Sequence, residues 1–326
     1  MKQNIIGIDI GGTKCAVTYG INDAGKIEIA GKSKFDTTNV TGTIAALLDT
    51  TAAIMQNHGL DSSNTPAIGI SCGGPLDSKK GLIMSPPNLP GWDNIPIVQH
   101  FEKRFGVKTA VQNDANACAL AEWKFGAARG YSNAIFLTFG TGMGSGLILD
   151  GKLYAGTNDN AGEVGHIRLE KTGPVGYGKA GSFEGFCSGS GLAQMARVKA
   201  MEKLQMGEPV SFCKSAADLN NLTAKIVAEA AEAGDPLAKE IYKECGHYLG
   251  KALSILIDVI NPEIIVLGSI YCRAQKLLEP AMQEVIDYET ITHTRRVCKI
   301  VPAELGESIG DYAALSVALN IIPDAK

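Results

Sequence analysis

One stretch of the sequence places a carboxylate where it could act as a general base. Residues 107–130 begin with an apolar run, Val107 to Val111, pass through Asn113 and Asp114, and continue as an alanine-rich segment. This order predicts a strand, a corner and a helix capped by Asp114, because an Asp oxygen at a helix start accepts bonds from unpaired backbone N–H groups. The helix dipole also favours the ionised carboxylate there. Such a carboxylate could take a proton from a substrate hydroxyl. The alternative is a helix cap with no catalytic role.

Two glycine-rich turns could bind phosphate. The first follows the apolar run of residues 4–10, which contains Asp9, and consists of Gly11, Gly12, Thr13 and Lys14. Glycines let backbone N–H groups approach an anion closely, and a threonine adds a hydroxyl donor. Asp9 could hold a metal ion through water. The alternative is an ordinary hairpin turn, since this turn lacks the spacing of a P-loop.

The second turn repeats the pattern of the first. In residues 134–149 an apolar strand runs into a glycine turn and then into another apolar strand. When the two are aligned, Thr138 takes the place of Asp9. The turn itself consists of Gly140, Thr141, Gly142 and Gly144. A strand–turn–strand unit that occurs twice suggests duplicated halves. Two such backbone nests could hold the phosphates of one nucleotide.

Further polar residues lie in loops where they could contact a ligand. Asn88 lies in the proline-rich loop of residues 85–92, which cannot form a helix. Glu163 and His166 are three residues apart after a glycine-containing loop, and Glu184 precedes a predicted helix. The alternatives are an Asx turn at Asn88 and ordinary surface positions for Glu163 and His166.

Strands and helices predicted between these motifs would position them. A strand over residues 67–71 ends in a turn that contains Gly74, and a strand over residues 263–268 ends in Gly268 and Ser269. Open α/β sheets bind ligands at such strand ends. Helical spacing or composition predicts helices over residues 41–58, 215–234 and 305–320 and a helix that begins at Asp235 and Pro236.

Composition restricts the class of protein. A chain of 326 residues favours two domains, and 45% hydrophobic with 20% charged residues is typical of a globular protein. The net charge of −4 gives no electrostatic reason to expect a nucleic-acid partner. Neither a signal peptide nor a membrane-spanning run is evident. The eight cysteines occur without a C-x-x-C pair, which favours reduced thiols and a cytoplasmic location.

Taken in order, the motifs IGIDIGGTK, NLPGW, QNDANA, TFGTGMGSG, GEVGH and IIVLGS resemble those of the ROK family, whose name stands for repressors, open reading frames and sugar kinases. The resemblance covers essentially the whole chain. It implies an α/β fold with two ribonuclease-H-like domains of the actin/hexokinase type and an interdomain active-site cleft. The smaller N-terminal domain would contain residues 1–113 plus 305–326, and the larger C-terminal domain residues 114–304.

The resemblance also implies an ATP-dependent, glucokinase-like sugar kinase that phosphorylates the 6-hydroxyl of a hexose, with Mg²⁺ and as a homodimer. Asp114 would be the catalytic base. Sugar hydroxyls would be bound by Gly74, Asn88, Asn113, Glu163, His166 and Glu184. ATP would be bound by Asp9, Gly11, Gly12, Thr13, Lys14, Thr138, Gly140, Thr141, Gly142, Gly144, Gly268 and Ser269.

Two features depart from the family pattern. The family usually has a zinc-binding segment, C-x-C-G-x-x-G-C-x-E, and here Val175, Tyr177 and Ser182 replace its three thiolates. Structural zinc needs four N or S donors, so we expect no structural zinc, with packing of Tyr177 and Phe183 in its place. Ser269 replaces a usual glycine, which would limit how closely the nucleotide approaches.

Other functions of the same family stay open. They are a non-catalytic sugar sensor, a transcriptional regulator, and a kinase for an N-acetylhexosamine or fructose. The first predicted strand begins at residue 4, which would leave no room for the helix-turn-helix domain of the repressors. The sequence does not distinguish glucose, mannose, fructose, allose and N-acetylated amino sugars as substrates, or ATP from polyphosphate as donor.

Overall fold

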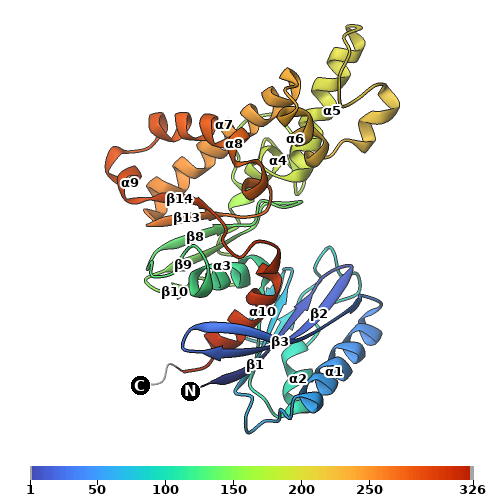
Figure 1. Cartoon of the computed structure of the whole chain (residues 1–326), viewed down its shortest axis with the longest axis vertical. Coiled ribbons are helices and arrows are strands. Elements are labelled where there is room, and N and C mark those ends of the chain that lie inside the picture. The colour runs from blue at the N-terminus through green and yellow to red at the C-terminus, as the bar shows by residue number, and fades with distance from the viewer. Residues whose placement is uncertain (1, 324–326) are drawn as a thin grey trace. The chain divides into compact units, whose positions relative to one another are not determined.

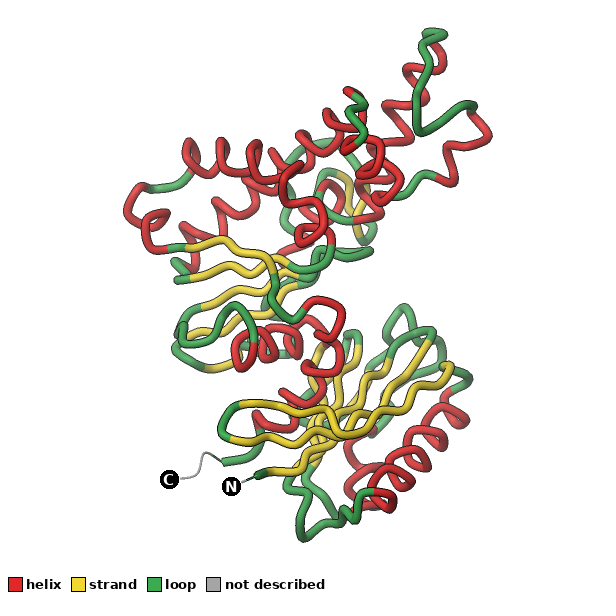
Figure 2. The backbone as a smooth tube through the Cα atoms, viewed as in Figure 1, coloured by secondary structure: helices red, strands yellow, loops and turns green. Residues whose placement is uncertain are grey.

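Two five-stranded sheets form the framework of the computed structural model, which describes residues 2–323 (Figures 1 and 2). In the order of hydrogen-bonded neighbours, the first sheet contains β3 (Lys26–Asp36), β2 (Lys14–Asp23), β1 (Gln3–Ile10), β4 (Ala67–Cys72) and β7 (Thr109–Asn113). The second contains β10 (Lys152–Leu153), β9 (Ser145–Leu149), β8 (Ala134–Leu137), β13 (Ile264–Leu267) and β14 (Lys299–Pro302). Each sheet has antiparallel pairing at one side and two parallel pairings at the other. The repeated strand order agrees with the predicted duplication.

The chain divides into two compact units, the first with residues 1–132, 146–161 and 304–326, and the second with residues 133–145 and 162–303. This division groups helix α3 (Asp114–Phe125) with the first unit, whereas the predicted boundary lay directly before Asp114. The predicted domain limits therefore stay a proposal.

Helices cover both faces of the first sheet. On β1, alternate residues Ile6, Ile8 and Ile10 belong to the core formed with α1 (Val40–Asn57) and α2 (Ile97–Phe105). The intervening residues face α10 (Ile309–Asn320). There the sheet carries glycine: a Cβ at Gly69 would lie 2.2 Å from the backbone nitrogen of Ala318. Small residues at this face therefore let α10 pack directly against the strands.

The second unit is rich in helices. They are η1 (Val164–His166), α4 (Phe183–Phe186), α5 (Gly189–Gln205), η2 (Ala216–Asn221), α6 (Ala224–Glu232), α7 (Pro236–Ile260), α8 (Ile270–Glu289) and α9 (Thr292–Val297). The predicted single helix over residues 215–234 is wrong. It divides into η2 and α6, because Thr223 caps a new helix by accepting a hydrogen bond from Ile226 N–H.

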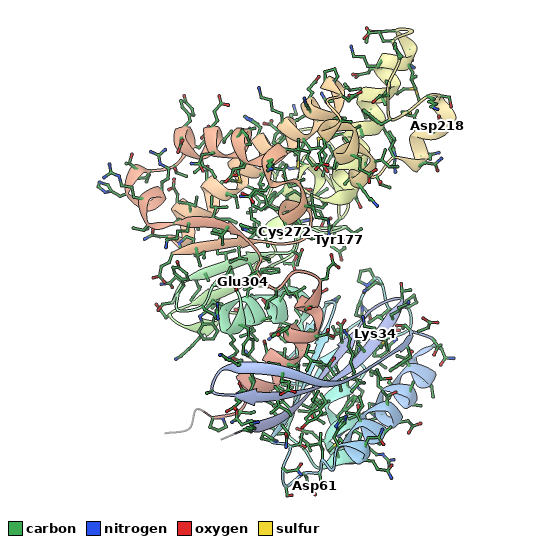
Figure 3. All side chains as sticks on the ribbon, in the orientation of Figure 1. Lys34, Asp61, Tyr177, Asp218, Cys272 and Glu304 are labelled. Atoms are coloured by element: carbon green, nitrogen blue, oxygen red, sulfur yellow. The ribbon has the colours of Figure 1, made fainter. Side chains whose placement is uncertain are left out.

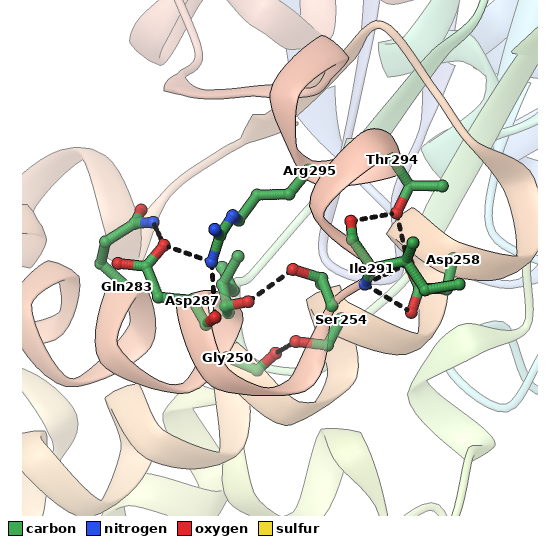
Figure 4. A network of polar contacts seen from close by, with 10 residues as sticks. Gly250, Ser254, Asp258, Gln283, Asp287, Ile291, Thr294 and Arg295 are labelled. Carbon is green, nitrogen blue, oxygen red and sulfur yellow. Dashed lines mark hydrogen bonds and ion pairs between the residues drawn. The ribbon is translucent and has the colours of Figure 1, made fainter.

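Polar side chains fix the short helix α9 to its two long neighbours (Figure 4). Thr294 on α9 donates a hydrogen bond to Asp258 on α7, and Arg295 forms an ion pair of 3.0 Å with Asp287 on α8. The turn from α8 into α9 therefore has a defined geometry.

Three further short elements complete the fold, namely the hairpins β5 (Leu76–Asp77) with β6 (Leu82–Ile83) and β11 (Val175–Gly176) with β12 (Lys179–Ala180), and the turn η3 (Gly306–Ser308). Within residues 2–323, the helices are too short or too polar to cross a bilayer. The cytoplasmic location stays a prediction.

Candidate active site

The carboxyl ends of three adjacent parallel strands bring predicted site residues of the first unit to one edge of the sheet. In the register of β1, β4 and β7, Asp9 pairs with Ser71, and Cys72 pairs with Asn113. The strand ends therefore deliver Asp9, the turn that contains Gly74, and the Asn113–Asp114 corner to the same edge, where α/β proteins bind ligands.

Asn88 lies against the first glycine turn and against the turn that contains Gly73 and Gly74. A Cβ at Gly12 would lie only 2.4 Å from the carbonyl oxygen of Asn88, so no larger residue fits there without movement of the backbone. A Cβ at Gly73 would lie 3.3 Å from Asn88 Oδ1, and one at Gly74 would lie 3.1 Å from Asn113 Nδ2. The structure thus brings together Gly12, Gly74, Asn88 and Asn113, which are far apart in the sequence.

The first glycine turn is held by a residue that sequence analysis missed. Gly11 N–H donates to the carbonyl of Lys14 at 3.1 Å, which closes the turn. Thr37 holds it from the neighbouring strand: its hydroxyl donates to the Gly11 carbonyl at 2.6 Å and its N–H to the Thr13 carbonyl at 2.9 Å. No motif in the sequence points to Thr37, because its role depends only on the pairing of β2 with β3.

The helix that follows β7 is capped differently from the prediction. Asn113, and not Asp114, is the N-cap, and Asp114 is the first helical residue. The predicted strand over residues 107–111 is also displaced, to Thr109–Asn113. The Asp114 side chain is exposed. Burial of its surroundings nevertheless raises the pKa of the Asp114 carboxyl group, against backbone N–H groups that favour the ionised form.

Asp9 has an electrostatic neighbour that the sequence did not reveal. Burial, then the charges of Asp114 and Asp311, raises the pKa of Asp9 from the usual 3.8 to about 6. Asp311, on α10, accepts a hydrogen bond from the Thr18 hydroxyl at 3.3 Å and forms an ion pair with Lys32. Lys32 and Asp311 are 279 residues apart in the sequence and belong to no motif, so only the fold brings them beside Asp9.

The second glycine turn is also closed by a backbone hydrogen bond from its first glycine. Gly140 N–H donates to the Gly142 carbonyl at 3.0 Å, and Thr138 Oγ1 accepts from Gly144 N–H at 2.9 Å. The turn also meets the start of α5, because Gly189 N–H donates to the Gly140 carbonyl at 2.8 Å. Ser190 N–H donates to the Thr141 carbonyl at 3.3 Å and Gly191 N–H to the Ser188 hydroxyl at 3.0 Å, so the first N–H groups of α5 fix the helix to the turn. Phosphate binding by this turn stays a prediction.

Glu163, His166 and Glu184 all lie close to this turn. Glu184 Oε2 accepts a hydrogen bond of 2.9 Å from Met143 N–H, so one carboxylate oxygen stabilises the turn itself. Glu163 and His166 bracket η1, in which His166 N–H donates to the Glu163 carbonyl at 3.2 Å. A Cβ at Gly165 would lie 2.3 Å from the Met143 carbonyl oxygen. The Met143 backbone therefore contacts both Glu184 and the short segment that carries Glu163 and His166.

Gly268 and Ser269 join the second turn from the next strand. A Cβ at Gly268 would lie 3.0 Å from the Thr138 carbonyl oxygen, and Ile270 N–H donates to the Phe139 carbonyl at 3.0 Å. Ser269 has φ of 46° and ψ of −103°, a conformation that favours glycine. The departure at this position therefore imposes strain on the backbone.

A pocket of about 810 Å³ opens beside these residues within the second unit. Gly140, Thr141, Gly189 and Ser269 line one side of it, and the other walls come from α5, α6 and α8. Small and apolar residues such as Ala193, Leu222 and Ala228 make up much of those walls. The pocket also contains Arg197, Lys225 and Arg273, which sequence analysis missed because each lies singly on a different helix, outside any motif.

The segment that departs from the family pattern is a small hairpin followed by α4. Ser182 caps α4 by accepting from Gly185 N–H at 3.1 Å, and its hydroxyl lies 3.0 Å from the Lys179 carbonyl, to which it donates. Phe183 is fully buried, as expected. The expected packing of Tyr177 is wrong: the side chain is 74% exposed because it occupies the hairpin turn with φ of 43° (Figure 3). The absence of zinc stays a prediction.

The predicted residues therefore form two local sets. Asp9, Gly11, Gly12, Thr13, Lys14, Gly74, Asn88, Asn113 and Asp114 belong to the first unit; Thr138, Gly140, Thr141, Gly142, Gly144, Glu163, His166, Glu184, Gly268 and Ser269 belong to the second. Within each set the segments meet. The role of each residue stays a prediction.

Comparison with known proteins connects both sets to one family. Residues 5–320 match the model of the ROK family. The chain is 31% identical to a glucokinase from Thermotoga maritima over 97% of both chains. It is 30% identical to the DNA-binding transcriptional dual regulator NagC of Escherichia coli over 84% of this chain and 66% of the regulator. A ROK family glucokinase from Streptomyces griseus, solved with glucose and AMPPNP, has 29% identity and a TM-score of 0.73 over 97% of this chain and 99% of that one.

Proposed function

Because the chain belongs to the ROK family, we propose that it is a sugar kinase that transfers the terminal phosphoryl group of ATP to the 6-hydroxyl of a hexose. The observation that carries the proposal is the edge of the first sheet, where a carboxylate at a helix start accompanies a closed glycine turn. Phosphoryl transfer needs alignment and charge stabilisation more than covalent help, and this edge offers groups for both.

Asp114 is the proposed base. Ionised, it accepts the proton of the sugar's primary hydroxyl as that oxygen attacks phosphorus. Burial raises the pKa of its carboxyl group, and a base whose pKa lies nearer the working pH transfers protons more efficiently. The other sugar hydroxyls would be hydrogen-bonded by the side chains of Asn88, Asn113, Glu163, His166 and Glu184 and by the backbone at Gly74. A sugar that lacks one of these hydroxyls would leave polar groups unpaired.

The glycine turns would bind the phosphates, and the pocket of the second unit would bind the nucleoside. Its small and apolar walls suit a flat base, which favours ATP over inorganic polyphosphate as donor. The relative crystallised with AMPPNP supports the same donor.

Mg²⁺ fits the set of carboxylates around Asp9. The ion prefers oxygen ligands and usually binds through one or two carboxylates plus substrate phosphates. Asp9 would hold the ion through water. The positive charge of the ion would offset the repulsion by Asp114 and Asp311 that, after burial, raises the pKa of Asp9. When bound, Mg²⁺ would neutralise part of the negative charge of the phosphates.

The decisive experiment is a coupled assay of ATP consumption with a panel of hexoses and N-acetylated amino sugars. Turnover with at least one sugar, and identification of a 6-phosphate product, is the expected result. The similarity to NagC supports one other candidate, a sugar-responsive regulator without catalysis. Sugar binding without turnover on any member of the panel would favour that candidate. We also propose a homodimer, which light scattering coupled to gel filtration would test.

A further inference from the structure

Glu122 is a fully buried carboxylate on α3, the helix that begins with Asp114. Glutamate is almost never completely buried unless its charge is satisfied. Here the partners are backbone N–H groups. Oε2 accepts from Ala127 at 2.8 Å and from Glu304 at 3.3 Å, and Oε1 accepts from Leu305 at 3.0 Å.

Two of these donors lie where the chain returns to the first unit. Ala303 is the last residue of the second unit, and Glu304 is the first of the segment that leads to α10. Ala303 N–H donates to the carbonyl of Leu267, the last residue of β13, at 2.9 Å. Two consecutive residues therefore donate hydrogen bonds to different elements. Ala303 donates to β13, the strand that precedes Gly268 and Ser269, and Glu304 donates to Glu122 on α3, the helix that begins with Asp114. The segment from Ala303 to Leu305, where the chain passes from the second unit into the first, is called the crossing below.

The surroundings of Glu122 are specific for a carboxylate. A Cβ at Gly126 would lie 2.0 Å from Glu122 Oε2, so a larger residue at this position would displace the carboxylate. The three donors approach both oxygens, which an ionised carboxylate accepts equally well. A glutamine would present N–H hydrogens to at least one of the donors and leave it unpaired.

We propose that Glu122 is a positioning residue for phosphoryl transfer, whose carboxylate fixes the crossing at Glu304 and Leu305 to the helix that begins with Asp114. The expected effect on kcat rests on the proposed kinase function. The fixing of the crossing by Glu122 rests on the hydrogen bonds alone. Displacement of a catalytic group by about 1 Å can reduce a rate about 100-fold. Glu122 is fully buried and is not one of the residues proposed to bind a substrate, so its loss should lower kcat more than it changes the KM of either substrate.

The test compares Glu122→Gln with Glu304→Gln. Glu304→Gln removes a carboxylate charge of the same segment, which forms an exposed ion pair of 3.5 Å with Arg129. It leaves the backbone N–H groups that bind Glu122 in place. Hydrogen exchange of the backbone amides of residues 127, 304 and 305 measures directly whether their hydrogen bonds to Glu122 are intact. We expect exchange there to be at least tenfold faster in Glu122→Gln. We also expect kcat to fall at least tenfold, with the KM for sugar and ATP within threefold. Glu304→Gln should match the wild type.

A second pair of variants keeps the inference testable if Glu122→Gln does not fold. Leu305 has φ of −76°, which proline can adopt, so Leu305→Pro deletes its N–H donor and is compatible with the φ of this residue. Leu305→Ala loses the same side chain and keeps the donor. Leu305→Pro should show faster exchange at Glu304 and lower kcat than Leu305→Ala.

Two results would overturn the inference. One is unchanged exchange in Glu122→Gln, or equal exchange in the two Leu305 variants. The other is faster exchange with wild-type kcat. If the wild-type protein phosphorylates no sugar, the proposed function fails, while the exchange measurements still decide whether Glu122 anchors the crossing.

Discussion

Asn113 and Asp114 share one backbone donor: Oδ1 of each accepts a hydrogen bond from Ala115 N–H, at 3.0 and 2.8 Å. The start of α3 is therefore capped twice. Loss of the Asp114 carboxylate leaves the Asn113 cap in place, so the catalytic role proposed for Asp114 can be tested with little effect on the helix.

Asp114→Ala should remove turnover and leave sugar affinity and thermal stability nearly unchanged. General-base catalysis contributes about 10²–10⁴-fold, and the remaining cap preserves the helix. Steady-state kinetics, calorimetric sugar binding and a melting curve on the same preparation would check this. A variant with near wild-type turnover would show that another residue is the base.

Glu163→Gln should chiefly raise the KM for the sugar, by about tenfold or more, because hydrogen bonds to a charged group are worth about 1.5–3 kcal/mol. Glu170→Gln is a matched control, since Glu170 is close in sequence but pairs with Lys251 at 2.6 Å. An unchanged sugar KM in Glu163→Gln would remove Glu163 from the sugar site.

The stability of the protein without substrates should fall between about pH 4 and pH 7 because of Asp9. Its pKa is raised from 3.8 to about 6 in the folded state, so the folded state binds the proton more tightly than the unfolded state. The resulting stabilisation is complete below pH 3.8 and is lost as pH rises through about 6. It amounts to at most about 3 kcal/mol. Urea unfolding across this range should show a flatter pH dependence for Asp9→Asn, and identical slopes would contradict the assignment.

Ser269→Gly should stabilise the protein by about 1 kcal/mol. Relief of the strain of a non-glycine residue in this backbone region should stabilise the folded state by about 1–3 kcal/mol. The greater freedom of glycine in the unfolded chain opposes this by about 0.4–1 kcal/mol. Ser269→Ala is the control, because it also loses the hydrogen bond of 3.1 Å from Arg273 but keeps a Cβ. Equal melting temperatures of the two variants would argue against strain.

Purified protein should contain no stoichiometric zinc, because Val175, Tyr177 and Ser182 stand where the family pattern has thiolates. Elemental analysis after dialysis checks this. About one zinc per chain would contradict the prediction.

Much of the fold was predictable because its signals are local. Apolar runs of four to eight residues before glycine turns correctly predicted β1, β4, β8 and β13 in nearly their observed positions. Element boundaries were less accurate. Asn113 replaced Asp114 as the helix cap, and the helix expected over residues 215–234 divided in two, since competing side-chain bonds decide where a helix begins.

The sequence by itself determined the order of the motifs, the two glycine turns and the family, because each depends on residues within a few positions of one another. Only the tertiary structure decided that Asp311 and Lys32 lie beside Asp9, that Glu184 stabilises the second turn, and that Glu122 binds the crossing. These contacts join segments far apart in the chain. Parallel strand pairing and helix packing bring them together, and no local pattern in the sequence records which side chains will meet there.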